Sequence, residues 1–125
     1  MNPKSAAEAY RNDAIGNAPP IKIIRMLYQG AIRFLDQAAR EDAADPQSSF
    51  VVFLGRADDI VTELRCSLAA EQAPELCAEL ERLYLFVESQ ISTAMTDRSI
   101  EPIEPARNVL ATLLDAWKTI EVQAV

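Results

Sequence analysis

Hydrophobic side chains recur with helical spacing in four segments of this 125-residue chain. The segments span residues 20–41, 49–70, 74–95 and 105–122. Within each one, apolar positions lie three or four residues apart, which places them on one face of a helix. Short polar connections separate the segments, so consecutive helices should pack against each other in opposite directions. The pattern predicts an all-α protein, an antiparallel (up-down-up-down) four-helix bundle.

The first segment is more apolar than a helix packed on one side requires. Its polar residues occupy an arc of about 120° on a helical wheel, which leaves about 200° apolar, against the ~100° that a one-sided helix needs. Either this helix lies at the centre of the bundle, or part of its apolar face awaits a partner. On the third segment, Leu85 and Phe86 fall outside the apolar face and are interpreted as a contact surface.

The N-terminal residues carry a separate helix signal. Ser5 and Glu8 have capping-box spacing, which predicts a short N-terminal capping helix from Ala6 to about Asp13. Tyr10 is its only large apolar side chain and would have to anchor it. We therefore expect a single domain, 1–125, in which residues 1–17 form a mobile cap and residues 18–125 form the bundle.

Composition and charge agree with a helical globular protein and limit the kinds of partner that it can bind. Half of the residues are hydrophobic, a quarter are charged, and only 3 are glycine. The net charge is −7, and sixteen of the nineteen acidic residues follow residue 40. Such a body repels a phosphate backbone, so we expect no nucleic-acid binding. The acidic surface either keeps the protein soluble or steers a basic partner segment.

The residues needed for catalysis and metal binding are largely missing. There is no histidine, which excludes imidazole chemistry, and Cys66 and Cys77 lack the spacing of a zinc site. Asp58 and Asp59 fall on a solvent face of their helix. We expect no enzyme, cofactor or metal. No secretory signal or membrane-length apolar run occurs, which predicts a cytoplasmic protein with reduced thiols, although a two-cysteine redox switch stays open.

The stretch from Ala18 to Leu35, APPIKIIRMLYQGAIRFL, resembles the signature of the FliS family of cytoplasmic export chaperones for flagellin. Tyr10 matches an aromatic residue that precedes this signature, and residues 56–68 resemble the second-helix stretch of the family. Further similar positions occur later in the chain, at Leu80, Leu83, Tyr84, Leu110, Leu113 and Trp117. Departures include Pro19 where the family usually has serine and Leu114 where arginine is frequent.

The resemblance implies a flagellin-binding export chaperone. Such a chaperone binds the C-terminal segment of flagellin, prevents premature polymerisation and supports delivery to the flagellar type III export apparatus. Export gate components and a second copy of the chain are further candidate partners. We expect flagellin contacts at Tyr10, Ile15, Ile23, Leu27, Ala31, Phe34, Leu85 and Phe86. The alternative is a helical structural or adaptor subunit that uses its apolar excess in a permanent oligomer.

Overall fold

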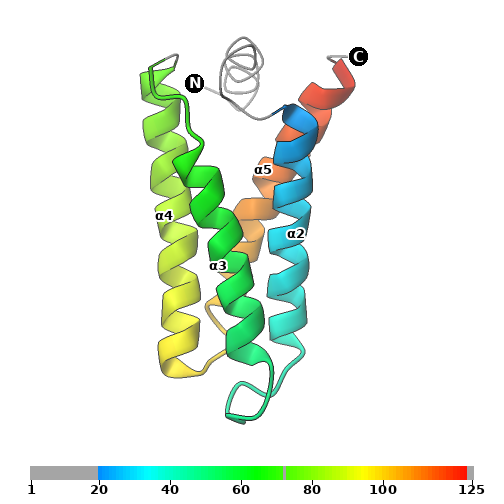
Figure 1. Cartoon of the computed structure of the whole chain (residues 1–125), viewed down its shortest axis with the longest axis vertical. Helices are drawn as coiled ribbons and strands as arrows, with labels where there is room; N and C mark the ends of the chain where they lie inside the picture. The colour runs from blue at the N-terminus through cyan, green and yellow to red at the C-terminus, as the bar shows by residue number, and fades with distance from the viewer. Residues whose placement is uncertain (1–19, 72, 124–125) are drawn as a thin grey trace.

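Four helices account for most of the chain. A computed structural model describes residues 20–71 and 73–123, and contains α2 (Ile21–Ala39), α3 (Phe50–Cys66), α4 (Pro74–Asp97) and α5 (Ile103–Gln123). Successive helices run in opposite directions (Figure 1). Helices α2 and α4 each pack against both α3 and α5. The prediction of an all-α four-helix bundle is confirmed, whereas the expected capping helix lies outside the described residues.

The arrangement of the helices is a closed ring, in which α2 and α4 stand at opposite corners. Helix α2 is therefore not central, and part of its apolar face remains open. Ile23 is 43% exposed, and Leu27 and Phe34 are only partly buried. Of the two interpretations of its surplus apolar arc, the structure supports the one in which a face is left uncovered.

Large side chains from all four helices fill the space inside the ring. Trp117, Tyr28, Tyr84 and Phe50 are the largest of the fully buried ones. The rings of Tyr28 and Trp117 lie 6.5 Å apart between centroids. The core of the described residues contains no buried charged side chain, so apolar burial supplies most of its stability.

Ion pairs on the outside of the ring join neighbouring helices. Arg25 on α2 pairs with Glu121 on α5 at 2.5 Å, and Arg107 on α5 pairs with Asp36 on α2 at 2.6 Å. These two ion pairs link α2 to α5 near both ends of the contact between the two helices. Their side chains remain partly exposed, so each contributes modestly to stability.

Two helix ends differ from the expected ones. Helix α3 ends at Cys66 rather than near residue 70, because the Ser67 N–H bonds to the carbonyls of both Glu63 and Leu64 and tightens the last turn. Helix α5 begins at Ile103 rather than Pro105. Pro105 occupies the third helical position, where a backbone N–H has no partner within the helix, so the missing donor costs nothing there.

Candidate functional site

The described residues offer no constellation suited to catalysis or metal binding. They contain no group of three or more His, Cys, Asp or Glu side chains that could hold a metal ion. Of the two free cysteines, Cys66 is exposed and Cys77 is buried. None of the four helices combines the length and apolar character required to cross a membrane. What the described residues do offer is uncovered apolar surface.

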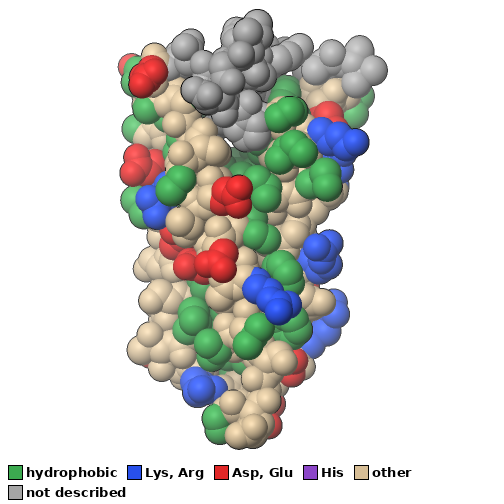
Figure 2. Space-filling model, viewed as in Figure 1, with side chains coloured by type: hydrophobic (Ala, Val, Ile, Leu, Met, Phe, Trp, Pro, Cys, Tyr) green, Lys and Arg blue, Asp and Glu red, His purple; other side chains and the backbone are tan. Residues whose placement is uncertain are grey.

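One such surface lies along the contact between α2 and α3. Ile23, Leu27 and Phe34 recur at the spacing of one helical face. Gly30 lies on the same face and allows a close approach, because a Cβ there would lie 3.4 Å from Ile60 Cδ1 of α3. One turn further on, the ring of Phe34 stacks on Phe53 of α3, with centroids 6.3 Å apart. Hydrophobic side chains are visible over both helices in Figure 2.

We call Ile23, Leu27, Phe34 and Phe53 the α2–α3 surface. Ile23 is exposed, whereas the other three are partly buried and pack against the edge of the core. The surface is thus built into the bundle and still accessible from outside.

One of the residues expected to contact flagellin is buried, and two others lie outside the described residues. Ala31 is fully buried in the core, so its expected position on a contact surface is wrong. The reason is geometric. Ala31 lies three residues after Tyr28 and four residues before Leu35, so it shares the inward face of α2 with these two buried side chains. Tyr10 and Ile15 lie outside the described residues.

The second surface lies on α4, and a groove between α4 and α5 adjoins part of it. Leu85 is 47% exposed and Phe86 is 42% exposed, which confirms that they lie outside the packed face of α4. A groove of about 290 Å³ runs nearby between α4 and α5. Its lining residues are Leu83, Asn108, Val109, Thr112 and Leu113, which we call the α4–α5 groove. Phe86 lies one helical turn from Leu83.

Sequence reasoning missed this groove. It assigned Leu83 and Val109 to the core faces of their helices, but the structure leaves both only partly buried. A helical wheel gives the direction of a side chain but not the distance to the neighbouring helix. No signal in the sequence distinguishes a leucine that closes the core from one that lines a groove at its edge.

The two apolar surfaces lie on opposite sides of the ring, because the α2–α3 contact and the α4–α5 contact share no helix. Charge is also divided between opposite corners. Helix α2 carries three basic residues and one acidic residue, whereas α4 carries five acidic residues and one basic residue. In Figure 2, Lys and Arg side chains follow the α2 edge, and Asp and Glu side chains lie over α3 and α4.

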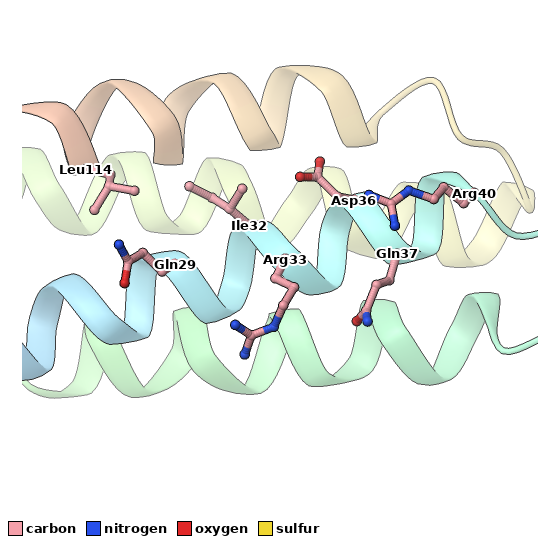
Figure 3. A pocket seen from close by; sticks show the side chains of 7 residues that line it. All are labelled: Gln29, Ile32, Arg33, Asp36, Gln37, Arg40 and Leu114. Atoms are coloured by element: carbon pink, nitrogen blue, oxygen red, sulfur yellow. The ribbon is translucent and has the colours of Figure 1, made fainter.

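A shallow depression of about 430 Å³ lies on the outer side of α2 (Figure 3). Six of its lining residues come from α2 and the turn after it, and the seventh, Leu114, comes from α5. Asp36 points toward α5, where it pairs with Arg107, while Arg33 and Gln37 point toward α3. The buried Oε1 atom of Gln37 accepts no hydrogen bond within the described part of the chain. The outer side of α2 therefore offers polar groups beside the α2–α3 surface.

Two partly open apolar surfaces on one helical ring are the kind of surface through which proteins bind other chains. Comparison with known proteins identifies the family. The family model described as "Flagellar protein FliS" matches residues 2–124. The chain belongs to the FliS family of flagellar secretion chaperones, whose members are chaperones and not enzymes.

Individual relatives support the same assignment over nearly full length. The chain is 30% identical over 120 residues to the flagellar secretion chaperone FliS of Campylobacter jejuni, covering 96% of this chain and 94% of that protein. It is 29% identical over 124 residues to FliS of Vibrio cholerae, covering 94% and 89%. It is 28% identical over 108 residues to FliSB of Pseudomonas aeruginosa, covering 85% and 84%.

Proposed function

We propose that this chain is a cytoplasmic export chaperone that binds the C-terminal segment of flagellin. Binding keeps flagellin from polymerising before export and supports its delivery to the flagellar type III export apparatus. The observation that carries the proposal is the presence of apolar surface on two opposite sides of one small bundle. Family membership supports the same conclusion.

The placement of the two surfaces favours a flexible client over a compact one. A globular partner docks on one side of a ring and leaves the opposite side exposed. An extended segment that folds as it binds can follow the bundle around and cover both sides. Ile23, Leu27 and Phe34 are the proposed contacts on one side, and Leu85 and Phe86 are the proposed contacts at the other.

In the free protein, residues 1–17 are proposed to cover part of the same surface, with Tyr10 as the anchor. Tyr10 and Ile15 are also proposed flagellin contacts. A short segment with so few large apolar side chains binds weakly. The longer flagellin segment buries more apolar area and therefore displaces it. The partly exposed side chains of the α2–α3 surface are consistent with a cover that is exchanged during binding.

Titration calorimetry with full-length flagellin and with flagellin lacking its C-terminal segment tests the proposal. We expect one-to-one binding of the full-length protein, a negative heat-capacity change from apolar burial, and no binding after truncation. Equal binding of both forms overturns the assignment of the C-terminal segment. A chaperone preparation that never dissociates to monomer and does not bind flagellin supports the alternative, a structural or adaptor subunit.

Two exposed positions make a matched pair for the same titration. Ile23→Asp places a charge on the α2–α3 surface and should weaken binding by about tenfold or more, since a buried unpaired carboxylate is costly. Ile100→Asp places the same charge at another half-exposed isoleucine, in the connection between α4 and α5. It should leave binding within about twofold, as for a site outside the interface.

Delivery to the export apparatus implies a second encounter, with export gate components. We propose that the gate recognises the chaperone with flagellin bound rather than the free chaperone. Pull-down of gate components with the complex and with the free protein tests this step. Sedimentation of the free protein over a range of concentrations tests whether a homodimer forms.

A further inference from the structure

Two arginines flank the aromatic pair of the α2–α3 surface, one from each helix. The guanidinium carbon of Arg33 on α2 lies 5.8 Å from the centroid of the Phe34 ring. The guanidinium carbon of Arg56 on α3 lies 5.8 Å from the same centroid. Phe34 in turn stacks on Phe53 with an angle of 24° between the ring planes. The two arginines and the Phe34 ring therefore form one site, in which two cations lie beside an aromatic ring.

These two arginines differ from most others in the bundle. Arg25, Arg65, Arg82 and Arg107 each form an ion pair with a carboxylate. Across the described ranges, neither Arg33 nor Arg56 has a carboxylate oxygen within 4.0 Å. The whole chain has 19 acidic and 12 basic residues. Acidic side chains are thus abundant, yet among residues 20–71 and 73–123 none pairs with these two exposed guanidinium groups.

The chemistry of the site determines what it can bind. A guanidinium group binds a carboxylate through two parallel N–H···O hydrogen bonds, and its planar shape also stacks on aromatic rings. The Phe34 and Phe53 rings offer an apolar surface for an aliphatic or aromatic side chain beside that carboxylate. A peptide with an acidic residue next to an apolar one matches both parts. A nucleic acid does not, because the protein as a whole carries a charge of −7.

We propose that Arg33 and Arg56 bind an acidic side chain of the flagellin segment, while an adjacent apolar side chain of that segment packs on Phe34 and Phe53. The inference rests on the proposed function and adds the chemistry of one contact to it. The charge complementarity also sets an orientation. The acidic part of the segment lies on α2 and α3, away from α4 and its five acidic residues.

Double charge reversal tests the contact, by titration calorimetry of the full chain with flagellin. Arg33→Glu with Arg56→Glu should weaken binding by about tenfold at 50 mM salt, and the loss should shrink to about threefold at 500 mM, where exposed charges are screened. Both arginines are exposed and lack ion pairs in the described structure. The variant should therefore retain the helical circular dichroism of the parent.

The matched control is Arg98→Glu with Lys118→Glu, which changes the net charge by the same amount at two exposed positions outside the α2–α3 surface. It should bind flagellin within about twofold of the parent. An equal loss in both double variants overturns the proposal in favour of a general charge effect. Normal binding by the Arg33 and Arg56 variant also overturns it, and leaves the proposed function intact. If the parent chain itself does not bind flagellin, both this proposal and the proposed function are overturned.

A second set of titrations identifies the partner group. In a series of flagellin segments, one acidic residue at a time is replaced by its amide. One of these replacements should weaken binding to the parent chain by about tenfold. The same replacement should have no effect on binding to the Arg33 and Arg56 variant. A segment with an amidated C-terminus should bind normally, and weaker binding would assign the contact to the terminal carboxylate instead. If charge reversal abolishes self-association and leaves flagellin binding unchanged, the occupant is a second copy of the chain.

Discussion

Tyr28 and Tyr84 join diagonally opposite helices through a hydrogen bond of 2.5 Å between their hydroxyl oxygens. Helices α2 and α4 are not neighbours in the ring, so this contact crosses the centre of the bundle. Burial raises the pKa of Tyr28 to about 12, although hydrogen bonds with the side chains of Tyr84 and Trp117 act against the rise. The hydroxyl therefore stays protonated at physiological pH. A polar contact at this depth favours one register of the two helices.

The first prediction concerns this pair. Tyr28→Phe and Tyr84→Phe each remove the hydrogen bond and should each lower the free energy of unfolding by about 1 kcal/mol. The double variant should lose less than the sum of the two, because the contact can be removed only once. Urea unfolding followed by far-ultraviolet circular dichroism measures all three. Strictly additive losses would show that the two hydroxyls do not stabilise each other.

A second prediction compares two leucines on α4. Leu80 is almost fully buried, so Leu80→Ala should cost about 2–5 kcal/mol through the cavity that it leaves. Leu85 is half exposed, so the same substitution there should cost about 0.5 kcal/mol. Urea unfolding measures the two costs.

Flagellin titration separates the same two variants by function. If Leu85 contacts flagellin, Leu85→Ala and Phe86→Ala should each weaken binding by about 1–3 kcal/mol while the bundle remains stable. Variants that are stable and bind normally would make both residues ordinary exposed hydrophobic side chains. A large loss of stability at Leu85 would place it in the core.

The third prediction concerns the N-terminal segment. Deletion of residues 1–17 should leave the bundle folded, because the buried core of the described chain extends from Ile24 to Ile120 and involves all four helices. The deletion should uncover apolar surface and promote self-association. Circular dichroism and sedimentation velocity measure the two effects. Loss of the helical signal would show that the segment belongs to the core.

A fourth prediction follows from the carboxylates between α3 and α4. Burial raises the pKa of Asp58, and the negative charges of Glu88 and Asp59 raise it further against the opposing effect of Arg65. A raised pKa in the folded state means that this group favours folding most below pH 3.8, its ordinary pKa. That contribution is lost as the pH rises through the folded-state value.

Asp58→Asn should therefore make the protein more resistant to urea at pH 7 and have little effect at pH 3. The exposed Asp115 on α5 provides a control, and Asp115→Asn should change the urea midpoint little at either pH. A stabilising effect of Asp58→Asn that is equal at both pH values would exclude charge as its cause.

The positions of the four described helices could be predicted from apolar spacing and from the prolines at residues 20 and 74. One end could not. Helix α4 continues to Asp97 and stops at Arg98, which has a left-handed φ of 47°. The Ser99 N–H then bonds to the Ala94 carbonyl at 3.1 Å. Glycine usually occupies such a position, and an arginine there leaves no stop signal in the sequence.

The candidate site was predictable only in part. The exposure of Leu85, Phe86 and Ile23 follows from helical periodicity, because each lies away from the inward face of its helix. The pairing of Phe34 with Phe53 does not follow, since it depends on the register between α2 and α3. The same register brings Arg33 and Arg56 to one ring. Single-helix patterns do not contain that information.

The two cysteines differ in a way that affects how the protein can be studied. Cys66 is exposed at the end of α3, while Cys77 is buried in the first turns of α4, where burial raises the pKa of its thiol. Thiolates react with maleimides and buried thiols resist them, so a dye should attach at Cys66 alone. The natural sequence thus contains its own single labelling position, and a fluorescent chaperone needs no added cysteine.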